Sequence, residues 1–185
     1  YEPFPFNPAE IDAVFLTHAH IDHCGRIPRL VREGFVGRVY ATRATCDLVH
    51  IMLPDSAHIQ ESDAEMLNRK NARRSEAPIT PLYTQADVFA ALEHFTPVPY
   101  QGTVDLGPVS VTFRDAGHIL GSAILEIVVR EGMQESKLVF SGDLGQPHQP
   151  ILRDPEPIVG ADFLIVESTY GDRIHRDYDK EPALL

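Results

Sequence analysis

The chain has 185 residues, of which 43% are hydrophobic and 23% charged, and its formal net charge is −11. This length and composition can bury the core of one globular domain, and no apolar run approaches the length of a membrane span. Two cysteines without metal-ligand spacing exclude a disulfide framework and a thiolate zinc site, and they favour a reducing, cytoplasmic compartment. The acidic balance argues against a simple basic nucleic-acid-binding module.

The first predicted strand leads into the most informative run of the chain. Residues 11–16 are apolar and rich in strand formers, and the next seven residues read T-H-A-H-I-D-H. Four potential metal ligands, His18, His20, Asp22 and His23, therefore follow the carboxyl end of a buried strand. Imidazole and carboxylate donors together suit zinc, with manganese or iron as alternatives. A polar turn in solvent is the competing interpretation, and the agreement of ligand type with spacing disfavours it.

Helix and strand signals alternate over the middle of the chain. The predicted order is a helix over 25–33, a strand over 38–41, a helix ending at Met52, a polar helical arm over 56–74 and a linker over 75–81. Thr84 then begins another helix, with Asp87 at the capping-box position. Its apolar side is expected to carry Val88, Phe89, Leu92 and Phe95. The whole stretch 56–81 has no obvious role in a core, and it is a candidate contact surface for a partner or substrate.

Three later strands also end in polar residues of the ligand type. The strand over 109–113 precedes D-A-G-H-I-L-G-S, in which His118 stands between glycines. The strand over 137–140 runs into S-G-D-L-G, which contains Asp143. A buried strand over 161–166 is expected to precede E-S-T-Y-G-D, which begins at Glu167. An acid at a strand end is weak evidence alone, but a repeated pattern of strand and polar turn predicts a site built on strand ends.

Taken together, these motifs resemble the ligand signature of the metallo-β-lactamase superfamily, whose first motif is H-x-H-x-D-H. The stretches G-H-I-L-G-S and E-S-T-Y-G are similar to those of its β-CASP branch, whose members cut nucleic acids and include RNase J and the endonuclease of pre-mRNA 3′-end processing. The resemblance implies an α/β fold, the αββα four-layer sandwich, here without its opening strands. It implies a metallo-β-lactamase domain over 1–166 and, over 167–185, the junction into a β-CASP domain.

The same resemblance implies two zinc ions, with manganese as an alternative. The implied ligands are His18, His20 and His118 on one ion, Asp22 and His23 on the other, and Asp143 between the two. A hydroxide that bridges the metals would attack phosphorus in line, with Asp22 orienting it or accepting its proton. Glu167 would act beside it, supporting a general-acid histidine. His148, His175 and Ser141 are candidates for contacting substrate or supporting the ligands.

The function that the resemblance implies is a ribonuclease of RNA processing or decay, acting on single-stranded RNA and not on membranes. The later histidines of the family have no counterpart, so this chain is expected to be an internal piece that is inactive by itself. Another hydrolase of this fold (on a thioester, a lactam or DNA 5′ ends) and a scaffold homologue without catalysis stay open as alternatives, as does a homo-oligomer. The acidic charge is a mild objection, because two dications offset about four negative charges.

Overall fold

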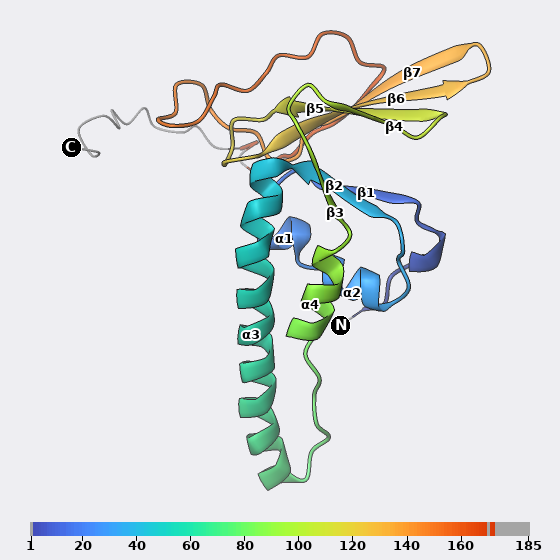
Figure 1. Ribbon diagram of the computed structural model, residues 1–185. Helices are drawn as coiled ribbons and strands as arrows, with labels where there is room; N and C mark the ends of the chain where they lie inside the picture. The colour runs from blue at the N-terminus through green and yellow to red at the C-terminus, as the bar shows by residue number, and fades with distance from the viewer. Residues whose placement is uncertain (1, 170, 173–185) are drawn as a thin grey trace. The chain divides into compact units, whose positions relative to one another are not determined.

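The computed structural model of the protein describes residues 2–169, 171 and 172. The chain divides into two compact units, Tyr1–Pro97 and Val98–Leu185. Figure 1 labels the elements of each unit, and the two units are described in turn.

The first unit combines a small sheet with four helices. After a 3₁₀ turn at Pro8–Glu10, its elements are β1 (Ala13–Phe15), α1 (Ile21–Cys24), α2 (Ile27–Arg32), β2 (Arg38–Thr42), α3 (Arg43–Arg74), α4 (Gln85–Leu92) and β3 (Phe95–Val98). The strand order is β1-β2-β3, and β1 runs parallel to β2. Val39 of β2, Val49 and Leu53 of α3, and Val88 of α4 are completely buried in one core. Helices therefore cover the sheet that carries the first ligand motif.

Helix α3 is a single helix of 32 residues, where the sequence predicts a helix to Met52 and a separate arm. Thr42 caps its start by accepting a hydrogen bond from the Thr45 amide, and Pro54 lies inside it. Proline removes one backbone hydrogen bond and often breaks a helix. The helix continues here because Leu53 and Ala57, on either side of Pro54, are both fully buried in the core.

The predicted capping box of helix α4 is confirmed. The Thr84 hydroxyl accepts from the Asp87 amide, and the Asp87 carboxylate accepts from the Thr84 amide at 2.7 Å. The predicted apolar side is wrong in part, because Phe89 is 59% exposed and Phe95 belongs to β3. The buried side of α4 is formed by Val88 and Ala91. Leu92 also packs against the core as predicted, so within the helix only Phe89 departs from the expected side.

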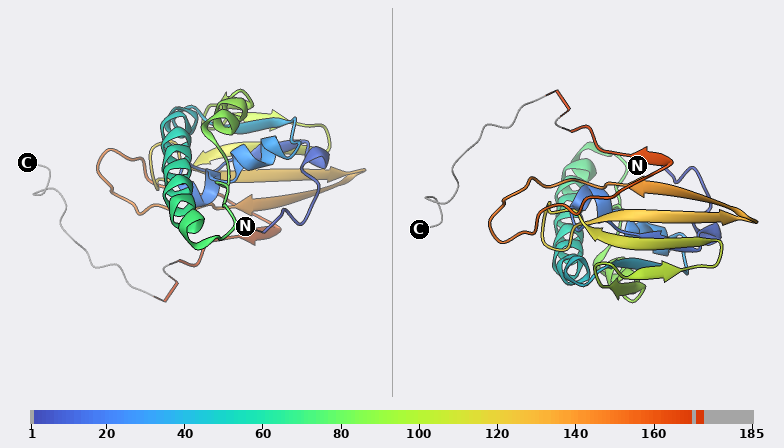
Figure 2. Two further views of the ribbon diagram at one scale, coloured as in Figure 1. Left: turned by 90° about the horizontal axis from the view of Figure 1, so that it is seen from below. Right: turned by 90° about the horizontal axis from the view of Figure 1, so that it is seen from above.

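The second unit contains a five-stranded sheet. Its strands are β4 (Thr103–Asp105), β5 (Val109–Asp115), β6 (Ala123–Glu131), β7 (Gln134–Phe140) and β8 (Phe163–Ile165). They lie in the order β4-β5-β6-β7-β8, antiparallel up to β7, with β8 parallel to β7 at the edge (Figure 2). The loops that follow β5, β7 and β8 carry the three later motifs.

A charged network crosses the middle of this sheet. Arg114 of β5 donates to Glu126 of β6 at 2.8 Å, and Lys137 of β7 pairs with the other oxygen of the same carboxylate. Burial opposes ionisation of Glu126, but the hydrogen bonds and charges of Lys137 and Arg114 outweigh burial and lower the pKa of its carboxyl. The network therefore links three neighbouring strands through one ionised carboxylate.

The expected burial of the last strand is wrong. Phe163 and Leu164 of β8 are 61% and 62% exposed, and Ile165 is 48% exposed. An unbroken apolar run predicts a strand that is covered on both faces. Here β8 is an edge strand, and the described part of the second unit contains strands and loops but no helix to cover it. Across the described residues of the whole chain, no helix combines the length and apolar character that a membrane span requires.

Candidate metal centre

The first ligand motif follows β1 and begins with a buried histidine. His18 is fully buried, and its Nδ1 lies 3.1 Å from the Thr17 hydroxyl oxygen. Its Nε2 lies 3.0 Å from Nδ1 of His20. Because Thr17 engages one ring nitrogen of His18, the other nitrogen is directed toward His20. A neighbouring hydrogen bond of this kind sets which imidazole nitrogen is offered to a metal.

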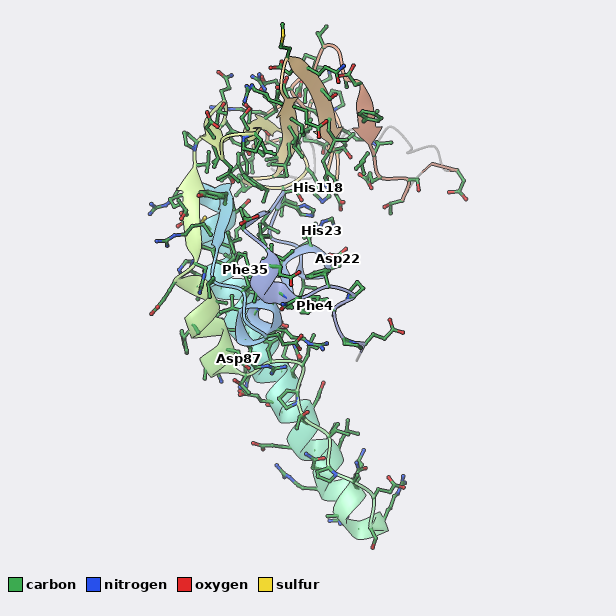
Figure 3. All side chains as sticks on the ribbon, turned by 90° about the vertical axis from the view of Figure 1, so that its right-hand side faces the viewer. Phe4, Asp22, His23, Phe35, Asp87 and His118 are labelled. Atoms are coloured by element: carbon green, nitrogen blue, oxygen red, sulfur yellow. The ribbon has the colours of Figure 1, made fainter. Side chains whose placement is uncertain are left out.

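Asp22 and His23 lie on α1, a helix of four residues. His20 is its N-cap residue, and the His20 carbonyl accepts from the amides of His23 and Cys24 at 3.0 and 2.9 Å. The His23 ring packs on His18 with centroids 4.1 Å apart, and its Nε2 lies 3.6 Å from an Asp22 oxygen. The Asp22 side chain is 77% exposed, so its carboxylate is open to solvent (Figure 3).

Cys24 closes this loop from inside the core. Its thiol donates to the Ala19 carbonyl at 3.3 Å, and the residue is completely buried. Burial raises the pKa of the Cys24 thiol to about 11, so the group is a neutral hydrogen-bond donor at physiological pH. The role of Cys24 is to pack and to tie the loop.

His18, His20, Asp22 and His23 form what we call the first half-site. A zinc ion with tetrahedral ligands at 2.0–2.1 Å requires donor atoms separated by about 3.3 Å. The separation of 3.0 Å between the ring nitrogens of His18 and His20 is close to this value. Both residues can offer one ligand atom to an ion. The donor chemistry of the first half-site therefore fits a divalent metal.

His118 lies in the loop after β5, and Ser122 organises that loop. The Ser122 hydroxyl accepts from the amides of His118 and Ile119 at 2.9 and 3.2 Å. The Ser122 carbonyl accepts from the Ala116 amide at 3.1 Å and from the Tyr100 hydroxyl at 2.9 Å. Ser122 itself is fully buried. Its two oxygen atoms thus hold four donors, which fixes the backbone that presents His118.

Asp143 lies in the loop after β7 and faces His118 within the second unit. Nε2 of His118 is 3.6 Å from an Asp143 oxygen, and each residue can offer one ligand atom. The Gly145 amide donates to the Ala116 carbonyl at 2.8 Å. A Cβ at Gly145 would collide with the Gly117 carbonyl, so the two loops touch backbone to backbone. His118 and Asp143 form the second half-site.

Glu167 and Ser141 support the Asp143 loop. The Glu167 carboxylate accepts from the Leu144 amide at 2.8 Å, and the Glu167 amide donates to the Ser141 hydroxyl at 3.3 Å. Ser141 is buried and donates in turn to the Gly142 carbonyl at 2.6 Å. Glu167 therefore holds the residue that follows Asp143, and Ser141 connects the ends of β7 and β8.

Comparison with known proteins decides the family. Residues 4–180 match the family described as the metallo-beta-lactamase superfamily. The chain belongs to the metallo-β-lactamase superfamily. Ribonuclease TTHA0252 of Thermus thermophilus is 43% identical over 178 residues, which are 96% of this chain and 36% of that relative. The predicted superfamily and its α/β fold are thus confirmed.

Two further relatives carry names from RNA metabolism. Transcription termination factor FttA of Methanocaldococcus jannaschii is 37% identical over 171 residues, which are 90% of this chain and 24% of that protein. Cleavage and polyadenylation specificity factor 73 of Drosophila melanogaster is 33% identical over 168 residues, 90% of this chain and 22% of that protein. Such relatives are the ones expected for the β-CASP branch of the superfamily. The chain spans between about a fifth and about a third of the length of the three relatives.

Two further residues, His148 and His175, are predicted to contact substrate or to support the ligands. His148 has a φ of 60° and lies in an exposed loop, where its amide donates to Asp154 at 2.7 Å and its Nδ1 is 3.7 Å from the same carboxylate. The structure thus gives His148 a partner in its own loop. His175 lies outside the described residues.

Sequence reasoning missed the residues that support the ligands. Thr17 and Ser122 could have been found as hydroxyl residues one and four positions from a ligand, because serine and threonine often bond to nearby backbone or side chains. Tyr100 has no such local signal, since it lies 22 residues from Ser122.

Proposed function

We propose that the native protein is a metal-dependent ribonuclease that cleaves single-stranded RNA in RNA processing or decay. One observation carries the proposal: at the end of a strand, the first half-site brings a ring nitrogen of the buried His18 to 3.0 Å from a ring nitrogen of His20. The relationship to Ribonuclease TTHA0252, which is 43% identical over 96% of this chain, supports RNA as the substrate. The proposal includes the activity, the substrate and a location in the cytoplasm. Free cysteines such as Cys24 and Cys46 stay reduced in that compartment.

The proposed site forms when the two half-sites supply ligands to the same pair of zinc ions. His18, His20 and His118 would hold one ion, Asp22 and His23 the other, and Asp143 would contact both. When bound, two such dications lower the pKa of a water molecule and neutralise charge that develops on a phosphodiester. Manganese is the alternative metal, because carboxylate and imidazole ligands accept it as well.

The protein's own groups then have separate tasks. Of the two ligand carboxylates, Asp22 is the more open to solvent, at 77% exposed against 23% for Asp143. We therefore assign to Asp22 the proton of the water whose oxygen attacks phosphorus in line, while the bond from phosphorus to the opposite ester oxygen breaks. Thr17 keeps the Nε2 atom of His18 directed toward the ligand point. Glu167 keeps Asp143 in place by holding the Leu144 amide, and it begins the junction that we assign to residues 167–185.

The experiment is performed on the native protein with end-labelled single-stranded RNA. Wild type is compared with Asp22→Ala and His118→Ala, and bound metal is measured for each protein. We expect about two zinc ions per chain in the wild type. We expect a loss of cleavage on the order of 10²-fold or more in Asp22→Ala, as removal of a general base usually causes.

Two exposed residues away from the half-sites provide matched controls. Asp47→Ala and His58→Ala remove the same side-chain types, and both variants should cleave like the wild type. If the wild type binds metal but leaves RNA intact, the ribonuclease proposal fails, and thioester and lactam substrates are tested next. If Asp22→Ala cleaves RNA normally, the assignment of the catalytic proton to Asp22 is wrong.

A further inference from the structure

The end of helix α3 projects as an arm that buries little apolar surface. We define the arm as residues 60–81, which comprise the end of α3 and most of the segment that returns from it toward α4 (Figure 1). Beyond Ala57, the only residue of α3 that is buried among those described is Ala64. Apolar packing therefore cannot explain why the arm keeps a defined shape.

Polar side chains hold the arm together instead. Asn68 accepts from the Ile79 amide at 2.8 Å and donates to the Ile79 carbonyl at 2.9 Å, and Asn71 donates to the Ala77 carbonyl at 3.0 Å. Nearer the core, Gln60 accepts from the Leu82 amide at 3.2 Å and Glu61 binds Gln85. At 3.6 residues per turn, these four α3 residues lie within about 100° of one another around the helix axis, so one helical face is committed to the returning segment.

The remaining surface of the arm carries a concentrated positive charge. Arg69, Lys70, Arg73 and Arg74 are all exposed, and residues 68–75 contain these four cations and no acid. Arg69 makes an exposed contact of 3.5 Å with Glu65, which is a weak pairing. Lys70, Arg73 and Arg74 make no ion pair with any other residue that the structure describes. A quarter of the 16 basic residues of an acidic chain are therefore gathered at one end of a helix.

This charge acts independently of the acidic body of the first unit. Lys70 lies 17 positions beyond Leu53, the last large side chain of α3 that is buried, which is about 25 Å along the helix axis. The Debye length at physiological ionic strength is about 8 Å, so acidic side chains around the core are screened from the tip. The arm also carries four acids, Glu61, Asp63, Glu65 and Glu76, so the positive surface that a polyanion meets is confined to residues 68–75, in a chain whose net charge is −11.

Stabilisation of the helix does not account for the whole cluster. Cations in the last turn interact favourably with the helix dipole, which explains Arg73 and Arg74. Arg69 and Lys70 lie one turn earlier, outside the range of that effect. They also place like charges at i and i+4 with Arg73 and Arg74, which destabilises a helix. Binding of an anionic partner would offset the repulsion among these four cations.

We infer that the basic end of the arm, formed by Arg69, Lys70, Arg73 and Arg74, binds phosphate groups of single-stranded RNA at a distance from the first half-site. This inference rests on the proposed function and names a second substrate contact for it. Figure 3 shows the arm extending away from Asp22 and His23, so only an RNA long enough to span that distance reaches both places. Lysine and arginine contacts to phosphate carry no base specificity, so the arm adds affinity for RNA length and not for sequence.

The test uses the native protein in an Asp22→Ala background, which keeps labelled RNA intact during binding measurements. Arg69→Gln/Lys70→Gln leaves the last-turn cations in place, and a second variant replaces all four cations by Gln. Each phosphate contact on a single strand contributes about 0.7 to the slope of log affinity against log salt. Extrapolated from 1 M to 0.15 M salt, the expected loss of affinity is on the order of tenfold for two contacts and a hundredfold for four.

A matched control neutralises acids of the same arm. Asp63→Asn/Glu65→Gln removes two exposed charges of opposite sign, and it should strengthen RNA binding or leave it unchanged. In the otherwise wild-type protein, the basic-to-Gln variants should raise KM for long RNA, leave kcat unchanged, and cleave short oligonucleotides normally. Circular dichroism and thermal unfolding verify that each variant keeps its helix content.

The outcomes separate this inference from the proposed function. Suppose that the wild type cleaves RNA, and that folded arm variants bind RNA with the same Kd and salt slope as the protein with an unchanged arm. The inference that the arm binds RNA is then overturned, and an acidic protein becomes the expected partner of the basic end. If the wild type neither binds nor cleaves RNA, the proposed function itself fails. A loss of affinity that is equal for short and long RNA also overturns the inference, because short RNA does not reach the arm.

Discussion

Replacing Ser122 by alanine tests how the protein presents His118. The substitution removes one oxygen atom, and the amides of His118 and Ile119 both lose their acceptor. Each hydrogen bond contributes a net of about 0.5–1.5 kcal/mol, so the free energy of unfolding should fall by about 1–3 kcal/mol. Because the lost bonds orient a metal ligand, zinc affinity should also fall by about 10–100-fold.

The assay measures zinc affinity by competition with a chelator, together with urea unfolding of the metal-free protein. Ser110→Ala is the matched control, because Ser110 is also a buried serine of the second unit and lies near the start of β5, whereas the His118 loop follows the end of that strand. Ser122→Thr keeps the hydroxyl and should recover part of the zinc affinity. The reasoning is refuted if Ser122→Ala and Ser110→Ala lose equal stability and both bind zinc like the wild type.

Three further predictions concern other parts of the fold. Glu126→Gln should lower the free energy of unfolding near neutral pH by about 1–3 kcal/mol, whereas the exposed Glu135→Gln should change little. Since the pKa of Glu126 lies below its usual 4.5, its contribution is present above that pH and is lost as pH falls through the lowered pKa, so acid titration of stability should be shallower in Glu126→Gln. Gly145→Ala should cost about 1–3 kcal/mol and weaken zinc binding, measured by unfolding and chelator competition, because the new methyl group meets a carbonyl of the His118 loop. Thr84→Ala should cost about 1 kcal/mol in urea unfolding, and Thr84→Ser should restore most of it, because only the hydroxyl cap differs.

Local patterns in the sequence predicted the elements that depend on local interactions. The Thr84 capping box and the strands before the ligand loops are present in the structure, because hydrogen bonds within four residues and alternating apolar side chains determine them. The continuity of α3 through Pro54 was not predictable in this way, since burial of Leu53 and Ala57 by distant elements overrides the proline. The exposure of β8 likewise depends on what covers a strand, which its own residues do not encode.

The candidate site shows the same division. The ligand residues themselves could be selected from the sequence, because metal-binding side chains occur there at characteristic spacing and resemble a known family. Their metals and catalytic roles stay predictions. Tyr100, which supports Ser122 from 22 residues away, could not be selected, because only the folded sheet brings their atoms together.

The contact between Gly145 and the Gly117 carbonyl has a consequence for protein engineering. Because the backbones of the His118 and Asp143 loops touch without intervening side chains, the two loops form one rigid unit. A substitution in either loop that shifts its backbone must displace the other loop as well. Attempts to alter the metal preference of this half-site should therefore redesign both loops together, and libraries that vary only one of them should yield mainly misfolded or metal-free proteins.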